Sequence, residues 1–218
     1  MPPEGAEGLL RAGEGALATE EQDLLRLLCA FTEERLRAAA RARQGLRERL
    51  AAGDAEAASA ELHAFLRECW EALDGLAREA NLCMHHLFSS AGLHAPMAMT
   101  RQCTLYVVRK KLHDAPATRD HPVSRLLWDR TREAPSEPYE RLSFLHNLGL
   151  FLPLAPLAQG SRLPGGADVP PVARGVVQRA DVPPTDAAEG TEGMLRWVSE
   201  FVRECRGELT EALRDATR

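Results

Sequence analysis

Residues 19–50, TEEQDLLRLLCAFTEERLRAAARARQGLRERL, decide the fold class of this chain. Alanine, leucine, glutamate and arginine dominate the stretch, and these residues lose little side-chain freedom in a helix. Thr19, followed by Glu20, Glu21 and Gln22, is typical of a helix start at which side chains cap exposed backbone amides. Apolar residues then recur at roughly helical spacing, which predicts one buried face. That face is predicted to contain Leu24, Leu28, Phe31, Leu36, Ala39, Leu46 and Leu50.

A second helical stretch follows at once, because Gly53 and Asp54 break the first helix and restart the chain. Apolar residues from Leu62 to Ala77 recur at helical spacing, and the pattern is compatible with a continuation to Leu87. Two long helices joined by a few residues lie antiparallel. The sequence therefore predicts an all-α protein that grows from a helical hairpin.

The remaining segments predict an up-down bundle of about five to six helices with a long Pro/Gly-rich loop before the C-terminal helix. Residues 97–112 favour a helix, although the β-branched residues of TLYVV leave a strand open. Further helices are expected after Pro122 and in YERLSFLHNLGLFL, residues 139–152. The predicted organisation is a flexible N-terminus (1–18), the helical bundle (19–152), the loop (153–188) and a C-terminal helix that packs on the bundle (189–218).

Composition suits one soluble globular core, because 44% of the 218 residues are hydrophobic and 27% are charged. The formal net charge of −5 disfavours non-specific attraction to nucleic acid, so contact with RNA would need a local cluster of cations. No apolar run is long enough to span a membrane, and MPPEGAEGLL lacks the pattern of a signal peptide. We therefore expect a cytoplasmic protein that does not bind membranes.

The cysteines are odd in number, widely spaced and never arranged as CxxC, which predicts buried, reduced thiols. They are Cys29, Cys69, Cys83, Cys103 and Cys205. Cys83, His85, His86 and His94 form the densest group of possible metal ligands, with Cys83 and His86 on one helix face. Their spacing matches no known zinc finger, so a core cysteine with solvent-facing histidines is favoured. We predict neither a metal nor a cofactor.

Signatures of common enzymes are absent from the sequence: it has no P-loop, no dinucleotide-binding glycine motif, no GxSxG and no HExxH. Glu68, Glu71 and Asp74 on the second helix are either paired carboxylates or a solvated acidic face. The sequence does not decide between these two interpretations.

RLSFLHN, residues 141–147, is the best candidate for a functional site. Arg141 and His146 point about 140° apart on a helix, so a substrate or a partner subunit has to bridge them. A guanidinium group binds phosphate through two parallel hydrogen bonds, and an imidazole both accepts and donates a proton near neutral pH. An alternative interpretation is a surface arginine and a histidine at the edge of the bundle.

The spacing of Arg141 and His146, with Asn147 directly after, resembles the R-x4-6-H motif on a late helix of the HEPN superfamily. The resemblance covers residues 20–152 as a helix pattern. It implies a homodimer whose two motifs face one cleft, in which Arg141 holds the scissile phosphate and His146 assists proton transfer as a 2′-hydroxyl attacks, without a metal. Leu142 stands where family members often have a polar residue.

A second basic cluster, RKKLHD, contains Arg109, Lys110, Lys111 and His113. Cations near a helix C-terminus complement the helix dipole, which explains the cluster without a ligand. If the chain binds RNA, the same cluster is predicted to contact backbone phosphates, together with Asn147.

Two functions of different classes follow. The first is a HEPN-like RNA-binding protein or metal-independent endoribonuclease of the toxin–antitoxin or defence type, with RNA and a cognate protein as partners. The second is a non-catalytic helical adaptor that engages a protein. The first predicts that Arg141 and His146 share a cleft, whereas the second predicts that they lie apart or that His146 is buried.

Overall fold

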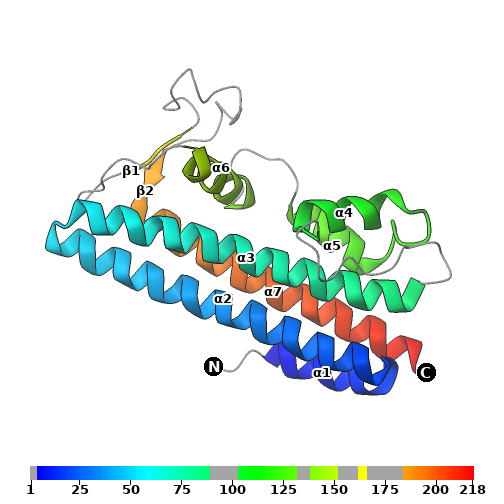
Figure 1. Cartoon of the computed structure of the whole chain (residues 1–218). Helices are drawn as coiled ribbons and strands as arrows, with labels where there is room; N and C mark the ends of the chain where they lie inside the picture. Colours follow the sequence, from blue (N-terminus) through cyan, green and yellow to red (C-terminus); the bar gives the residue numbers. More distant parts are fainter. Residues whose placement is uncertain (1–3, 89–102, 132–137, 152–161, 166–183) are drawn as a thin grey trace. The chain divides into compact units, whose positions relative to one another are not determined.

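The computed structural model describes residues 4–88, 103–131, 138–151, 162–165 and 184–218 of the chain. These residues form seven helices and one small two-stranded sheet, so the predicted all-α helical bundle is confirmed (Figure 1). The helices are α1 (Glu4–Ala16), α2 (Thr19–Ala52), α3 (Ala55–Phe88), α4 (Leu105–Asp114), α5 (Pro122–Arg130), α6 (Pro138–Phe151) and α7 (Ala187–Ala216). The strands are β1 (Arg162–Leu163) and β2 (Thr185–Asp186).

The chain divides into two compact units, and the long helices α2, α3 and α7 each contribute a segment to both. Unit 1 consists of Met1–Glu34, Glu71–Arg130 and Ser199–Arg218, and unit 2 of Arg35–Trp70 and Thr131–Val198. Helices α1, α4 and α5 therefore belong to unit 1, and α6 with the small sheet belongs to unit 2. Each unit is assembled from segments that are far apart in the sequence.

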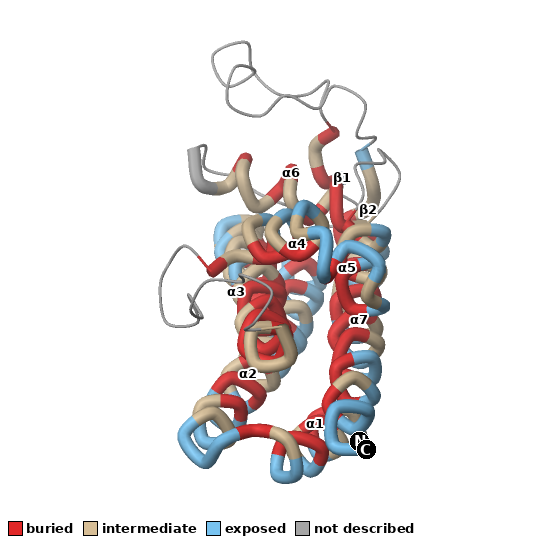
Figure 2. The backbone as a smooth tube through the Cα atoms, turned by 90° about the vertical axis from the view of Figure 1, so that its right-hand side faces the viewer, coloured by how far each residue is buried: buried red, intermediate tan, exposed pale blue. Residues whose placement is uncertain are grey.

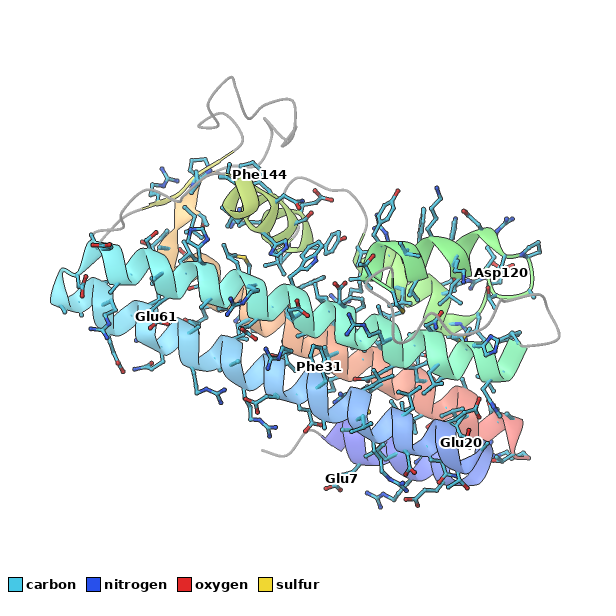
Figure 3. The ribbon with its side chains drawn as sticks, in the orientation of Figure 1. Glu7, Glu20, Phe31, Glu61, Asp120 and Phe144 are labelled. Atoms are coloured by element: carbon cyan, nitrogen blue, oxygen red, sulfur yellow. The ribbon has the colours of Figure 1, made fainter. Side chains whose placement is uncertain are left out.

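The predicted break between the first two long helices lies at Gly53 and Asp54. Gly53 has φ +72°, a left-handed conformation that glycine adopts without the steric cost of a Cβ. Asp54 then caps α3, because its Oδ1 accepts the backbone N–H of Ala57 at 3.1 Å. In unit 2, Glu61 of α3 lies against Gly45 of α2, where a Cβ would come within 2.7 Å of its carboxyl carbon (Figure 3).

The start and the buried face of α2 differ in detail from the prediction. Glu21 Oε2 accepts the N–H of Ala18 at 3.0 Å, so Ala18, and not Thr19, stands at the cap. Leu25 is fully buried, whereas Leu24 and Leu36 of the predicted stripe are only half-buried. Helical spacing alone allows the buried stripe to be placed one residue off, because neighbouring leucines satisfy the same pattern.

Residues 4–16 form helix α1, where the sequence predicted a flexible extension. The helix buries Ala6, Leu9 and Ala12, and a Cβ added to Gly5 would lie 3.5 Å from Cβ of Arg206 on α7. Glycine lowers the intrinsic propensity of such a helix, but packing of an apolar face outweighs that cost. Contacts made in the folded chain thus order a segment whose local composition favoured disorder.

The centre of unit 1 is a buried ion pair between α3 and α7. Both oxygens of the Glu79 carboxylate accept from Arg206, Oε2 from Nε and Oε1 from Nη2, each at 2.8 Å. Thr32 of α2 donates its hydroxyl to Glu79 Oε1 at 2.6 Å, and Glu33 Oε1 lies 3.3 Å from Arg206 Nη1. Three helices are therefore joined by one hydrogen-bonded network.

In unit 2, the small sheet leads directly into α7. Arg162 pairs with Asp186 in an antiparallel register, and Asp186 Oδ1 then accepts the backbone N–H groups of Ala188 and Glu189. This cap starts α7 two residues before the predicted position. Most of the predicted 153–188 loop, residues 153–161 and 166–183, lies outside the described residues. Figure 2 shows buried positions recurring along α7, as an amphipathic helix requires.

Candidate functional site

Helix α6 holds the RLSFLHN motif and is anchored by its apolar residues. Pro138 occupies its first position, where the missing N–H costs nothing. Leu142, Phe144, Leu145 and Leu148 are buried, and Figure 3 labels Phe144 on this helix. The burial of these side chains fixes the rotation of α6, and with it the directions of Arg141 and His146.

The imidazole of His146 stacks on the indole of Trp70 from α3. The ring centroids are 4.7 Å apart and the planes differ by 6°. Burial lowers the pKa of His146 from 6.5 to about 4, because a half-buried imidazolium loses hydration. His146 is therefore neutral at pH 7, and neither ring nitrogen has a hydrogen-bond partner among the described residues.

A pocket of about 360 Å³ lies between α3 and α6 within unit 2. Its walls are partly apolar, and three nitrogen-bearing side chains also reach it: His63 and Arg67 from α3 and His146 from α6. Among the described residues, the lining consists of Ala60, His63, Ala64, Leu66, Arg67, Leu145, His146 and Gly149. Two imidazoles and a guanidinium group beside apolar walls suit an anionic group attached to a planar or apolar body.

The two α3 side chains of the pocket are held in different ways. A Cβ at Gly149 would lie 3.1 Å from Nδ1 of His63, so glycine lets this imidazole rest on the α6 backbone. Burial lowers the pKa of His63 as well. Arg67 is bound to the neighbouring Glu68, whose Oε1 accepts from Nε at 3.3 Å and from Nη2 at 3.0 Å.

Arg141 does not line the pocket that His146 lines. Its side chain is half-buried, and its Nε is buried without a hydrogen-bond partner among the described residues. Asn147 is also outside the pocket lining, and its Nδ2 donates to Ser143 Oγ of its own helix at 3.5 Å. The structure thus brings His146 together with His63 and Arg67 rather than with Arg141.

Helix α4, in unit 1, holds the second basic cluster, and its helical structure excludes the strand alternative. Asp74 of α3 accepts the backbone N–H of Leu105 at 2.9 Å, and Thr104 accepts that of Val107 at 3.4 Å. Burial raises the pKa of Asp74 to about 6, and its hydrogen bond to Leu105 acts in the opposite direction. Asp74 is therefore a buried capping residue and not part of a solvated acidic face.

The cations of the α4 cluster differ widely in exposure. Arg109 is buried, with its guanidinium carbon 5.1 Å from the ring centroid of Tyr106 and 5.7 Å from that of Trp128. His113 stacks on Trp128, with centroids 3.7 Å apart. Lys110 is exposed and Lys111 is half-buried. Of the four predicted phosphate contacts in this cluster, Arg109 and His113 are held by aromatic rings and the two lysines are the more accessible.

In the cysteine and histidine group near the end of α3, His85 is half-buried and its Nδ1 has no hydrogen-bond partner among the described residues. Cys83 is buried, and His86 Nδ1 lies 2.9 Å from Glu21 Oε2. His94 lies outside the described residues. Among the residues that the structure describes, no three metal-binding side chains are grouped around one position. All five cysteines are buried and free, as predicted.

Sequence reasoning missed His63 and Arg67 as residues of the pocket, and it named Glu68 without linking it to Arg67. Glu68 is buried, and it accepts hydrogen bonds from Arg35 Nη1 at 2.8 Å and from Arg67. The interpretation of Glu68 as part of a solvated acidic face is therefore wrong. His63 and Arg67 are four residues apart, which places them on one helix face. That spacing was the only local signal, and it does not reveal that α6 lies opposite.

No helix in the described part of the chain is both long and apolar enough to cross a membrane. Comparison with protein-family models, curated proteins and solved structures gave no match.

Proposed function

We propose that this chain is a HEPN-like RNA-binding protein that receives part of an RNA strand in the α3–α6 pocket. The observation that supports the proposal best is the meeting of His63, Arg67 and His146 in one pocket. Side chains of these types can donate hydrogen bonds to phosphate, and a planar ring such as that of His146 is of the kind on which bases stack.

The proposal is for binding and not for cleavage by one chain. Attack by a 2′-hydroxyl needs a base for its proton and a cation on the scissile phosphate within the same cleft. With a pKa of about 4, His146 is a weak base at pH 7, and Arg141 does not line its pocket. The resemblance also implies a homodimer, and sedimentation analysis is expected to give twice the monomer mass.

Binding is tested by fluorescence anisotropy with a short labelled single-stranded RNA. His146→Ala is expected to weaken binding by about tenfold, the cost of one good stacking contact. Arg47→Ala is the matched control, because Arg47 is an exposed arginine of α2 in the same unit. Absence of binding by the wild-type protein, or equal binding by the His146 variant, contradicts the proposal.

The same RNA, separated on a denaturing gel after incubation, tests cleavage. We expect intact RNA with the wild-type protein, with Arg141→Ala and with His146→Ala. Cleavage by the wild-type protein that either substitution abolishes would contradict this expectation and would assign a catalytic role to the substituted residue.

A non-catalytic adaptor is the second candidate, and the aromatic contacts of the α4 cluster favour it. Arg109 and His113 are engaged with Tyr106 and Trp128, and the chain as a whole is negatively charged. Under the adaptor proposal, the double substitution of Lys110 and Lys111 by alanine leaves the fluorescence anisotropy measured with labelled RNA unchanged. Under the RNA proposal it weakens binding and reduces its salt dependence, because two phosphate contacts are lost.

A further inference from the structure

Arg67 is the one arginine among the described residues that line the α3–α6 pocket. Its side chain is 66% exposed, so its charge reaches both the pocket and solvent. The arginine of the RLSFLHN motif, Arg141, is half-buried and lies outside this lining. The group best placed to meet an anion beside His146 therefore comes from α3 and not from α6.

Glu68 holds the guanidinium group of Arg67 from one side. Nε and Nη2 donate to Glu68 Oε1, which leaves Nη1 without a partner among the described residues. A guanidinium group fixed in this way loses less freedom when it binds a further anion.

The charge of Glu68 does not cancel that of Arg67 completely. The same carboxylate accepts from Arg35 Nη1 at 2.8 Å, so one negative charge is shared between two guanidinium groups. Glu68 is also buried, and it is not among the residues that line the pocket. The face of Arg67 toward the pocket thus remains electropositive.

His63 stands one helical turn before Arg67 on the same face of α3, and His146 lies opposite on α6. A neutral imidazole donates one N–H, so His146 can add a single donor beside the guanidinium group of Arg67. Phosphate accepts several hydrogen bonds at once and suits this set.

We infer that Arg67 binds a backbone phosphate of RNA in the α3–α6 pocket, in the place that the motif resemblance gives to Arg141. The inference rests on the proposed RNA-binding function. It names Arg67 as the phosphate contact, with His146 as a flanking donor and His63 as a further residue of the pocket. It also predicts that Arg141 makes no contribution to binding by a single chain.

Anisotropy titrations with labelled single-stranded RNA at several salt concentrations test the inference with four proteins. Arg67→Ala is expected to bind about tenfold more weakly, the loss of one charge-assisted hydrogen-bonded contact. The slope of log K against log salt should fall by about 0.7, the contribution of one phosphate contact on a single strand. Arg67→Lys keeps the slope but loses affinity, because an ammonium group lacks the planar fork. Arg141→Ala should bind like the wild type.

Arg47→Ala again controls for the general loss of one exposed positive charge. Urea unfolding of each variant shows whether Arg67→Ala still folds, and the exposure of Arg67 predicts that it does. If RNA binds but Arg67→Ala matches Arg47→Ala, the inference is overturned while the proposed function stands. If the wild-type protein binds no RNA at any salt concentration, the proposed function fails and the inference with it.

Discussion

Arg206 and Glu79 form a bidentate ion pair that is almost completely shielded from water. The Arg206 side chain is 1% exposed and that of Glu79 is 0% exposed, and two nitrogens donate to two oxygens at 2.8 Å. A buried pair of this kind stabilises little compared with apolar residues of the same size, but the loss of one partner leaves an uncompensated charge.

Glu79→Gln should therefore destabilise the protein by about 3–5 kcal/mol, because Arg206 stays charged in the core. The size of the side chain hardly changes, so a cavity does not contribute. Urea denaturation followed by circular dichroism measures the effect. Glu211→Gln removes an exposed pair with Arg214 and is expected to cost less than about 0.5 kcal/mol. Similar losses in both variants would contradict the predicted role of burial.

His146 makes folding sensitive to acid. Its pKa is lowered from 6.5 to about 4 by burial, so the folded state favours the neutral ring. Its contribution to stability is complete above pH 6.5 and is lost as the pH falls through about 4. The pKa values of His63 and His121 are lowered too, which adds to the loss in the same direction.

His146→Phe keeps a planar ring against Trp70 but cannot be protonated. From neutral to acid pH, the free energy of unfolding should fall by about 1 kcal/mol less for the variant than for the wild type. This value is reduced because the ring is partly exposed. Urea midpoints measured across that range provide the test. Parallel curves for the two proteins would show that His146 does not titrate in the way its burial predicts.

Asp74 makes the folded state less stable as the pH rises, which is opposite to the effect of His146. Burial raises its pKa from 3.8 to about 6, so its contribution to stability is complete below pH 3.8 and is lost as the pH rises through about 6. Asp74→Asn retains an oxygen for the N–H of Leu105 and removes the charge. The variant should gain stability relative to the wild type as the pH rises through this window.

Asp74→Ala separates capping from charge. It removes the acceptor for Leu105 and should cost about 1 kcal/mol, which is typical of a lost helix cap. Thermal unfolding at acid and neutral pH compares the three proteins. If the alanine variant were as stable as the asparagine variant, the hydrogen bond to α4 would not contribute.

Gly75 of α3 lies against Thr32 and Phe31 of α2. A Cβ at this position would come within 2.5 Å of Thr32 Oγ1, which donates to Glu79, and within 3.1 Å of Phe31 Cδ1. Gly75→Ala should therefore destabilise the protein by about 1–3 kcal/mol through overpacking. Gly207→Ala is the control: nothing lies within 4 Å of that Cβ, so it should stabilise α7 by about 0.5–1 kcal/mol. Differential scanning calorimetry of both variants checks the opposite signs.

The sequence by itself determined the all-α class and most helix positions. Apolar residues at helical spacing, together with Gly53 and Asp54 at the turn, fix the hairpin of α2 and α3 because these signals act between near neighbours. Pro138 and the apolar residues after it likewise place α6. The positions of Arg141 and His146 on one helix were therefore predictable from sequence.

Only the tertiary structure decided which side chains meet. Helical periodicity gives the faces of a helix but not the partner that each face receives, so Arg67 and His63 could not be assigned to the pocket of His146. The contact between Arg206 and Glu79 could not be predicted either, because the two residues are 127 positions apart. Helix α1 is a further example, because its glycines disfavour a helix and its contacts with α7 stabilise it. Local chemistry specifies each helix, whereas burial between distant segments specifies the site, because desolvation and hydrogen bonding depend on neighbours in space.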